Sequence, residues 1–348
     1  MSYRTFDRFQ GIWLGSIIGQ ALANRIGERT KIIDYRAQWL ITRDKIAEIL
    51  LETERLEVSY ITHQLAEILQ SKENIDLQNS DRANSQEFLL TQDSDRVFLG
   101  NEIEKNRSLK YDSNLLSMLP LIIFYGNERN LFTEVISQCD LKLANTKDNA
   151  EYIEDILLWS YLLTLALNNK LLPDTNVSLI VRQILTGALV KKTSLIAKLE
   201  TVVEAWEQGI SLHQLSELLS KNNSKIGQTA IALSIYCFAT TPQDFRLSIE
   251  RAASLEPQTA WLTTALTGTI SGAYNGIAGI PKNWRAMANQ NFTYQSASQT
   301  VVKLFKAWLG VYLIDSDRFS YNQELDAVAT PNVIQSRPAL KIISQKSF

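Results

Sequence analysis

Residues 255–284 read LEPQTAWLTTALTGTISGAYNGIAGIPKNW, and this stretch decides the fold. Gly268, Gly272 and Gly276 recur in it at every fourth position, ahead of Trp284. Residues four apart lie on one face of an α-helix, so the glycines predict a helix that another backbone can approach closely. A glycine inside a helix costs about 0.5–1 kcal/mol relative to alanine, and close packing is the explanation that we favour.

A matching triplet, Gly11, Gly15 and Gly19, lies in residues 7–23, DRFQGIWLGSIIGQALA. The two predicted helices lie at opposite ends of the chain, and their matching glycine spacing indicates that they meet in the core of one domain. A membrane span is the alternative for residues 258–281, because they carry no charged side chain over a length that can cross a bilayer. Their five threonines and scarcity of strongly apolar residues argue against it, so we expect no transmembrane segment.

The composition is that of a globular protein without a nucleic-acid partner. The chain has 348 residues, of which 45% are hydrophobic and 21% charged, and its net charge of −2 provides no basic field for nucleic acid. Residues 1–9, MSYRTFDRF, lack a signal-peptide pattern, so we expect a cytoplasmic protein. The two histidines, His63 and His213, have no neighbouring ligand pattern, which disfavours a histidine-rich metal site or a nucleophile–histidine triad.

Helical periodicity dominates the remaining sequence, and no run of alternating strands appears. Residues 240–255, TTPQDFRLSIERAASL, begin like a helix, with Thr241 as N-cap and Asp244 three residues later. Apolar residues recur three and four apart in residues 45–56, 59–69, 114–125, 152–167, 177–189, 195–206, 212–219 and 229–238. The predicted fold class is therefore all-α, a compact domain of many helices.

The domain organisation that we expect is a single helical domain over residues 1–314. Residues 71–110 are polar and rich in Asn, Ser, Asp and Gln, which predicts a long loop or an insertion. Residues 315–348 are expected to be a C-terminal tail with little core of its own.

Three segments of the chain resemble the ADP-ribosylglycohydrolase family, whose members remove ADP-ribose from proteins or small molecules. Residues 8–22 are similar to its motif R-F-x-G-x-x-x-G-x-x-x-G-D-A-L-G, and residues 113–121 to N-G-x-x-M-R-x-x-P-L. Residues 255–284 are similar to G-G-D-T-D-T-x-x-x-x-x-G-A-x-x-G-A-x-x-G-x-x-x-I-P-x-x-W, most specifically from Gly268 to Trp284. The resemblance implies an all-α fold around a central cleft.

The same resemblance shows where this chain departs from the family. Related enzymes hold two Mg²⁺ or Mn²⁺ ions through a T-D-D-T motif and the G-D-T-D-T motif, because hard ions need several oxygen ligands. Residues 259–262, TAWL, stand where D-T-D-T is expected, and Gln20 stands at the aspartate of the first motif. The nearest match to T-D-D-T is residues 42–45, TRDK, ahead of the apolar helix IAEILL.

Two interpretations of residues 42–45 remain open. Arg43 and Lys45 can supply fixed positive charge that neutralises Asp44 and Glu256 without a metal. Alternatively, the two cations are a solvated helix face, and Trp261 is then an ordinary core aromatic.

The candidate site residues follow from these matches, and none is assigned a catalytic role. The candidates for the cleft are Gln20, Thr42, Asp44, Asn114, Glu256, Thr259 and Trp261. The weak candidates for metal ligands are Asp44, Asp93, Asp95 and Glu256. The pair at positions 93 and 95 has D-x-D spacing in the polar loop, but a single carboxylate cannot replace a two-metal cage.

Three functions are consistent with this pattern. The missing carboxylates favour a binding or regulatory pseudoenzyme with a degenerate magnesium site and no cofactor, which would bind a protein partner or an ADP-ribose-like ligand. A second hypothesis is a divergent hydrolase that removes ADP-ribose with Mg²⁺ or Mn²⁺. A third is a scaffold or assembly factor unrelated to ADP-ribose. Whether the chain is an enzyme stays open at this point, with the sequence favouring no turnover.

Overall fold

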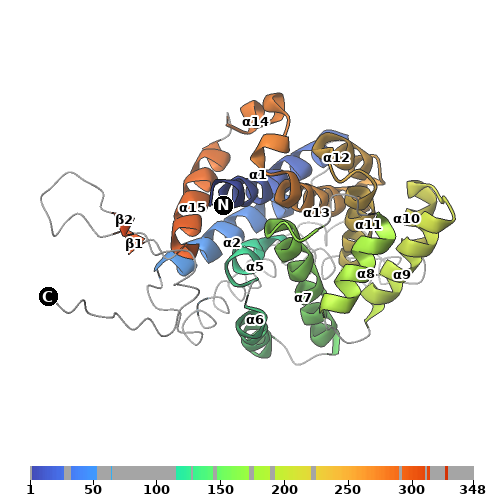
Figure 1. The fold of residues 1–348 in the computed structure, drawn as a ribbon, viewed down its shortest axis with the longest axis horizontal. Coiled ribbons are helices and arrows are strands. Elements are labelled where there is room, and N and C mark those ends of the chain that lie inside the picture. The colour runs from blue at the N-terminus through green and yellow to red at the C-terminus, as the bar shows by residue number, and fades with distance from the viewer. Residues whose placement is uncertain are drawn as a thin grey trace, which may run out of the picture.

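A computed structural model describes the helical body of the chain (Figure 1). The described residues are 2–26, 33–52, 64, 115–126, 128–143, 147–171, 176–188, 193–220, 225–289, 292–309, 312–313 and 326–327. The elements are α1 (Ser2–Ile26), α2 (Ile33–Glu52), α5 (Leu119–Tyr125), α6 (Arg129–Leu143), α7 (Lys147–Leu167), α8 (Val177–Ala188), α9 (Ser194–Glu207), α10 (Leu212–Ser220), α11 (Ile226–Thr240), α12 (Phe245–Ala253), α13 (Pro257–Asn275), η1 (Ile277–Gly279), α14 (Lys282–Asn289), α15 (Phe292–Trp308), β1 (Tyr312–Leu313) and β2 (Asp326–Ala327). Apart from the two short strands every described element is a helix, which confirms the all-α fold class.

Helices α1 and α13 pack antiparallel at the centre, with a larger interface than any other pair of described elements (Figure 1). Gly15 faces the backbone of Gly268, and Gly11 faces that of Gly272. A Cβ atom built on any of these four glycines would overlap the facing carbonyl oxygen. The close packing predicted from the glycine spacing is therefore confirmed for these four glycines, whereas Gly276 lies past the end of α13 as its C-cap, with a φ of 69°.

Helix α13 is buried despite its many hydroxyl groups. The hydroxyls of Thr264, Thr267 and Thr269 each donate to the backbone carbonyl four residues earlier, at 2.5, 2.7 and 2.8 Å. Because these polar groups are satisfied within their own helix, the helix can enter the core without unpaired hydroxyls at these positions. Within the described part of the chain, no helix combines the length and the apolar character that a membrane span requires.

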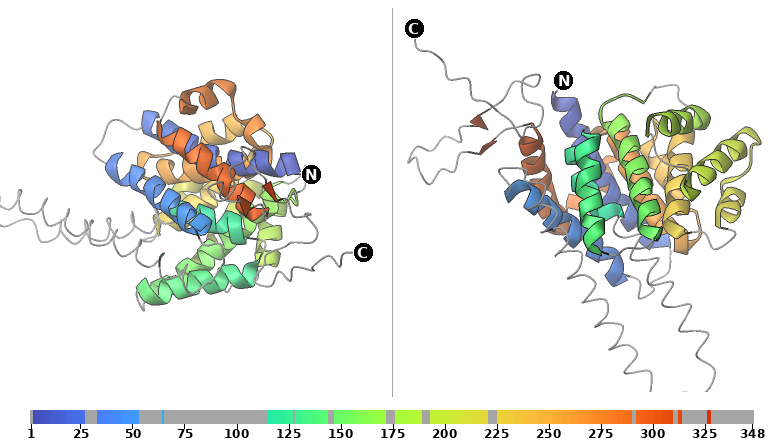
Figure 2. Two further views of the ribbon diagram at one scale, coloured as in Figure 1. Left: turned by 90° about the vertical axis from the view of Figure 1, so that its left-hand side faces the viewer. Right: turned by 90° about the horizontal axis from the view of Figure 1, so that it is seen from below.

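The core extends from this central pair in two directions. On one side α15 lies along α1 and α2 (Figure 2), and its Phe305 ring packs against Phe6 and Phe9 of α1 with centroids 5.0 and 4.9 Å apart. On the other side α11 covers α13, and α8, α9 and α10 lie outside α11. Each face of the central pair therefore meets a different group of helices.

The predicted boundaries of the second helix were wrong at its start. The apolar pattern predicted a helix over residues 45–56, whereas α2 runs from Ile33 to Glu52. Residues 42–45 therefore lie inside a helix and not ahead of one. The earlier residues 33–44 mix polar and aromatic side chains, so their weak apolar periodicity concealed the first three turns.

The prediction that Thr241 is an N-cap is also wrong. Thr241 is the C-cap of α11, and its hydroxyl lies 3.1 Å from the carbonyl oxygen of Cys237. Asp244 is the N-cap of α12, because its carboxylate accepts the backbone N–H of Leu247 at 2.9 Å. Threonine and aspartate both cap helices well, and the turn between them decides which one does so.

Some expectations fall on residues that the structure leaves out. The segment 71–110 lies entirely outside the described residues, and residues 315–348 are described only at 326–327, where β2 pairs antiparallel with β1. The helices α6, α14 and α15 were not singled out by the sequence pattern. The boundaries of a single domain over residues 1–314 stay a prediction.

Candidate functional site

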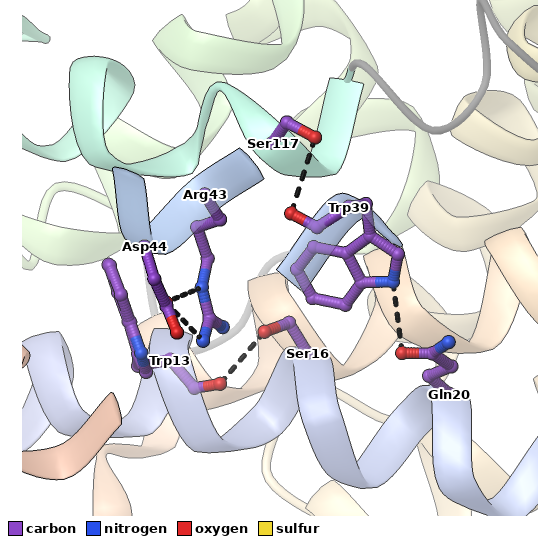
Figure 3. Close-up of polar contacts among 7 residues, drawn as sticks. All are labelled: Trp13, Ser16, Gln20, Trp39, Arg43, Asp44 and Ser117. Carbon is purple, nitrogen blue, oxygen red and sulfur yellow. Dashed lines mark hydrogen bonds and ion pairs between the residues drawn. The ribbon is translucent and has the colours of Figure 1, made fainter. Parts of the chain in front are cut away.

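The candidate residues that the structure brings together lie between α1 and α2 (Figure 3). The indole Nε1 of Trp39 donates to the side-chain oxygen Oε1 of Gln20 at 2.9 Å, and both residues are buried. Thr42 is buried one turn further along α2. The residue at the position of the family's first aspartate is therefore a neutral amide that accepts a hydrogen bond from the neighbouring helix.

Arg43 is the charged residue of this junction. Its Nε and Nη2 atoms donate to Oδ1 of Asp44 at 3.0 and 2.9 Å, and the guanidinium carbon lies 4.1 Å from the ring centroid of Trp13 and 5.2 Å from that of Trp39. The Arg43 side chain is fully buried, whereas that of Asp44 is 23% exposed. Arg43 is thus held between two indoles and paired with the carboxylate beside it (Figure 3).

Burial governs the electrostatics of this pair. It lowers the pKa of Arg43, while the charge of Asp44 and its hydrogen bonds act in the opposite direction. An arginine keeps its proton at neutral pH even when its pKa falls, so the guanidinium remains a cation. Because the Arg43 side chain is buried, the interpretation of residues 42–45 as a solvated face does not describe Arg43, although Lys45, two residues later, is exposed.

A segment next to a third helix, α5, contributes to the junction through a side chain. Ser117, just before α5, directs its hydroxyl towards the carbonyl oxygen of Trp39 at 3.4 Å, and Ser117 is fully buried. On α1, the hydroxyl of Ser16 donates to the carbonyl oxygen of Trp13 at 2.8 Å.

The candidates on α13 differ in their exposure. Glu256 is the exposed N-cap of α13 and makes no capping hydrogen bond with its side chain. Thr259 is half-buried, with its hydroxyl 3.3 Å from the carbonyl oxygen of Glu256, and Trp261 is buried in the main core. Gly15, which is close to Trp13 on α1, packs on Gly268, and Gly268 lies about three turns further along α13 than Glu256. Because Trp13 contacts the residue next to Asp44, the structure does not bring Glu256 and Asp44 together.

The remaining candidates cannot be placed. Asn114, Asp93 and Asp95 lie outside the described residues. Among the residues that are described, no group of three or more His, Cys, Asp or Glu side chains is arranged to hold a metal ion. A pair of hard divalent ions needs several carboxylates, so the described residues of this junction do not fit a two-metal centre.

The two indoles of the junction were not identified as site residues from the sequence. Trp39 lies one turn before Arg43 on the same helix, and this i, i+4 pair of an aromatic residue and a cation was a detectable signal. Trp13 carried no such signal, because its contact with Arg43 depends on how α1 and α2 are aligned. The contact between Trp13 and Arg43 could therefore not be predicted from local sequence patterns.

Comparison with known proteins identifies the fold family. No curated protein sequence matches the chain. The sequence model of the family described as ADP-ribosylglycohydrolase matches residues 1–311, which is most of the chain. This match covers both glycine helices, α2 and the Arg43 junction. Together with the all-helical architecture, it shows that the chain belongs to the ADP-ribosylglycohydrolase family.

Proposed function

We propose that this member of the family has lost two-metal hydrolysis and acts by binding an ADP-ribose-like ligand or a protein partner. The observation that carries the proposal is the buried Arg43, which stands where the family resemblance expects the first aspartate of T-D-D-T. A fixed cation at such a position repels a divalent ion and supplies internally the charge that Asp44 needs.

The other positions of the motifs support the same proposal. Gln20 replaces an aspartate, and its oxygen already accepts the indole N–H of Trp39. Leu262 and Trp261 occupy the D-T-D-T segment and are buried in the core. Neither an apolar side chain nor an indole can act as a ligand for Mg²⁺ or Mn²⁺, whose preferred ligands are oxygens.

The retained scaffold supports a role in binding. The family match extends over residues 1–311, and the glycine packing of α1 on α13 is complete. A chain that keeps the scaffold while replacing the ionic ligands is expected to retain recognition more readily than turnover, because turnover depends on the metal ions. ADP-ribose is the ligand that the family membership suggests first.

The test is a hydrolysis assay on full-length protein with an ADP-ribosylated protein and an ADP-ribosylated small molecule, each with Mg²⁺ or Mn²⁺. A metal-dependent member of the family serves as positive control. We expect no release of ADP-ribose above the protein-free rate. Metal-dependent release would contradict the proposal and establish the alternative, a divergent hydrolase that uses ligands outside the described residues.

A thermal-shift titration with ADP-ribose separates the two kinds of binding partner. A ligand that binds only the folded state raises the melting temperature once its concentration exceeds Kd. A saturable increase would indicate an ADP-ribose-like ligand. Without such an increase, the search turns to protein partners and to a scaffold role.

A further inference from the structure

The surroundings of Arg43 resemble a binding site more than an ordinary ion pair. Its side chain has no exposed surface, and two indoles, Trp13 from α1 and Trp39 from α2, enclose the guanidinium (Figure 3). Asp44 supplies the counter-charge from the solvent side, at 23% exposure. The cation is thus enclosed by aromatic faces and one carboxylate.

This enclosure has to offset a large desolvation penalty. Removing a charged group from water is unfavourable unless hydrogen bonds and opposite charge compensate for it. Asp44 satisfies Nε and Nη2, while Nη1 has no hydrogen-bond partner among the described residues. The remaining compensation available in the described structure comes from the two ring faces, because aromatic rings attract cations most strongly when water is excluded.

We propose that Trp13, Trp39 and Asp44 form a cage for a guanidinium cation, and that Arg43 is its built-in occupant. The cage holds α2 on α1, because its two walls belong to different helices. A guanidinium fits better than an ammonium ion, since it is flat enough to lie between rings while two of its N–H groups reach one carboxylate oxygen.

The inference is independent of the proposed loss of catalysis. It rests on the contacts between α1 and α2, and it can fail while the absence of turnover is confirmed. The reverse also holds, because a hydrolase that takes its metal ligands from other segments could retain the same cage.

The first test empties the cage with Arg43→Ala. We expect a melting temperature lower by roughly 5–10 °C, because a paired, buried cation is lost. Methylguanidinium at about 10 mM should restore about 2–4 °C in this variant and nothing in the wild-type protein, because engineered cavities can take up small molecules of matching shape. Methylammonium at the same concentration and the exposed-site variant Lys45→Ala are the controls.

The test compares the change in melting temperature that each of the two cations causes in Arg43→Ala. Stabilisation of Arg43→Ala by methylguanidinium and not by methylammonium supports the cage. Equal effects of the two cations, or no effect of either on the folded variant, would overturn it.

A second comparison keeps the proposal testable if Arg43→Ala does not fold. Arg43→Lys retains a cation between the indoles, whereas Arg43→Met fills similar volume without charge. The cage predicts melting temperatures in the order arginine, lysine, methionine. A simple packing role predicts that methionine matches or exceeds lysine, because a well-packed apolar side chain avoids the desolvation penalty. That order would reject the cage.

Discussion

Helix α1 has two faces that hold their neighbours by opposite means. Towards α13 it presents Gly11 and Gly15, and the two backbones touch with no side chain between them. Towards α2 it presents the large side chains of Trp13 and Gln20, which contact a buried cation and an indole N–H. One face depends on the absence of side chains and the other on specific side-chain chemistry.

The difference indicates which part of the molecule can change without loss of the fold. Contact between the backbones of α1 and α13 leaves no room for substitution, so the glycine pattern is the feature that still resembles the family. The α2 face tolerates new chemistry if the new groups satisfy one another, as Gln20 does with Trp39 and Arg43 with Asp44. The glycine packing that supports the fold and the polar contacts with α2 therefore lie on different faces of the same helix, α1.

The largest effect is expected for Gly15→Ala, which tests the glycine face. Its added Cβ would overlap the carbonyl oxygen of Gly268, and a backbone cannot move aside as a flexible side chain can. We expect a loss of about 3 kcal/mol or more in the free energy of unfolding, measured by urea denaturation. The control is Ala21→Val, at an exposed position of the same helix. Equal losses of unfolding free energy in the two variants would show that the glycine face is no more sensitive to substitution than the exposed face.

A smaller effect is expected for Gln20→Leu, which tests the polar face. The substitution leaves the buried N–H of Trp39 without its acceptor, so we expect a loss of about 2 kcal/mol in the free energy of unfolding. Gln183→Leu is the comparison, because its hydrogen bond to the carbonyl oxygen of Lys170 is exposed to water. If Gln20→Leu were neutral, the hydrogen bond to Trp39 would not hold this junction together.

A partly exposed ion pair between Glu151 and Lys225 provides a reference for the pair at Arg43. The backbone N–H and the hydroxyl of Ser194, at the start of α9, both donate to the carboxylate of Glu151 on α7. The same carboxylate pairs with Lys225 at 2.9 Å. Burial raises the pKa of Glu151, but these hydrogen bonds and the charge of Lys225 outweigh burial and leave the pKa at about 2. This carboxylate is therefore more acidic in the folded protein than in the unfolded chain.

The smallest effect is expected for Glu151→Gln, and it depends on pH. A carboxyl group with a depressed folded-state pKa stabilises the protein above its unfolded pKa, near 4.5, and this contribution is lost as the pH falls towards 2. Because the Glu151 side chain is 28% exposed and water screens the pair, we discount the contribution to about 1 kcal/mol. The stability difference between wild type and variant should be constant above about pH 5 and shrink below it. Glu200→Gln, at an exposed site on α9, should give no comparable change, and a pH-independent difference for Glu151→Gln would contradict the prediction.

Local spacing predicted some of these features and not others. The glycine triplets predicted the packing of α1 on α13 because a four-residue period is a property of a single helix. The cage was not predictable, since the contact of Trp13 with Arg43 depends on the tertiary alignment of α1 and α2. The prediction for residues 42–45 failed because the start of α2 at Ile33 lies in a segment with weak apolar periodicity.

The most direct test of the account is a calorimetric titration of full-length protein with Mg²⁺ and Mn²⁺, followed by the same titration with ADP-ribose present. We predict no saturable heat of metal binding in either case, because Asp44 is the one carboxylate among the described positions that match the metal motifs, and two hard ions need several. Saturable binding of two ions per chain would contradict the account and show that other residues of the chain have rebuilt the metal centre.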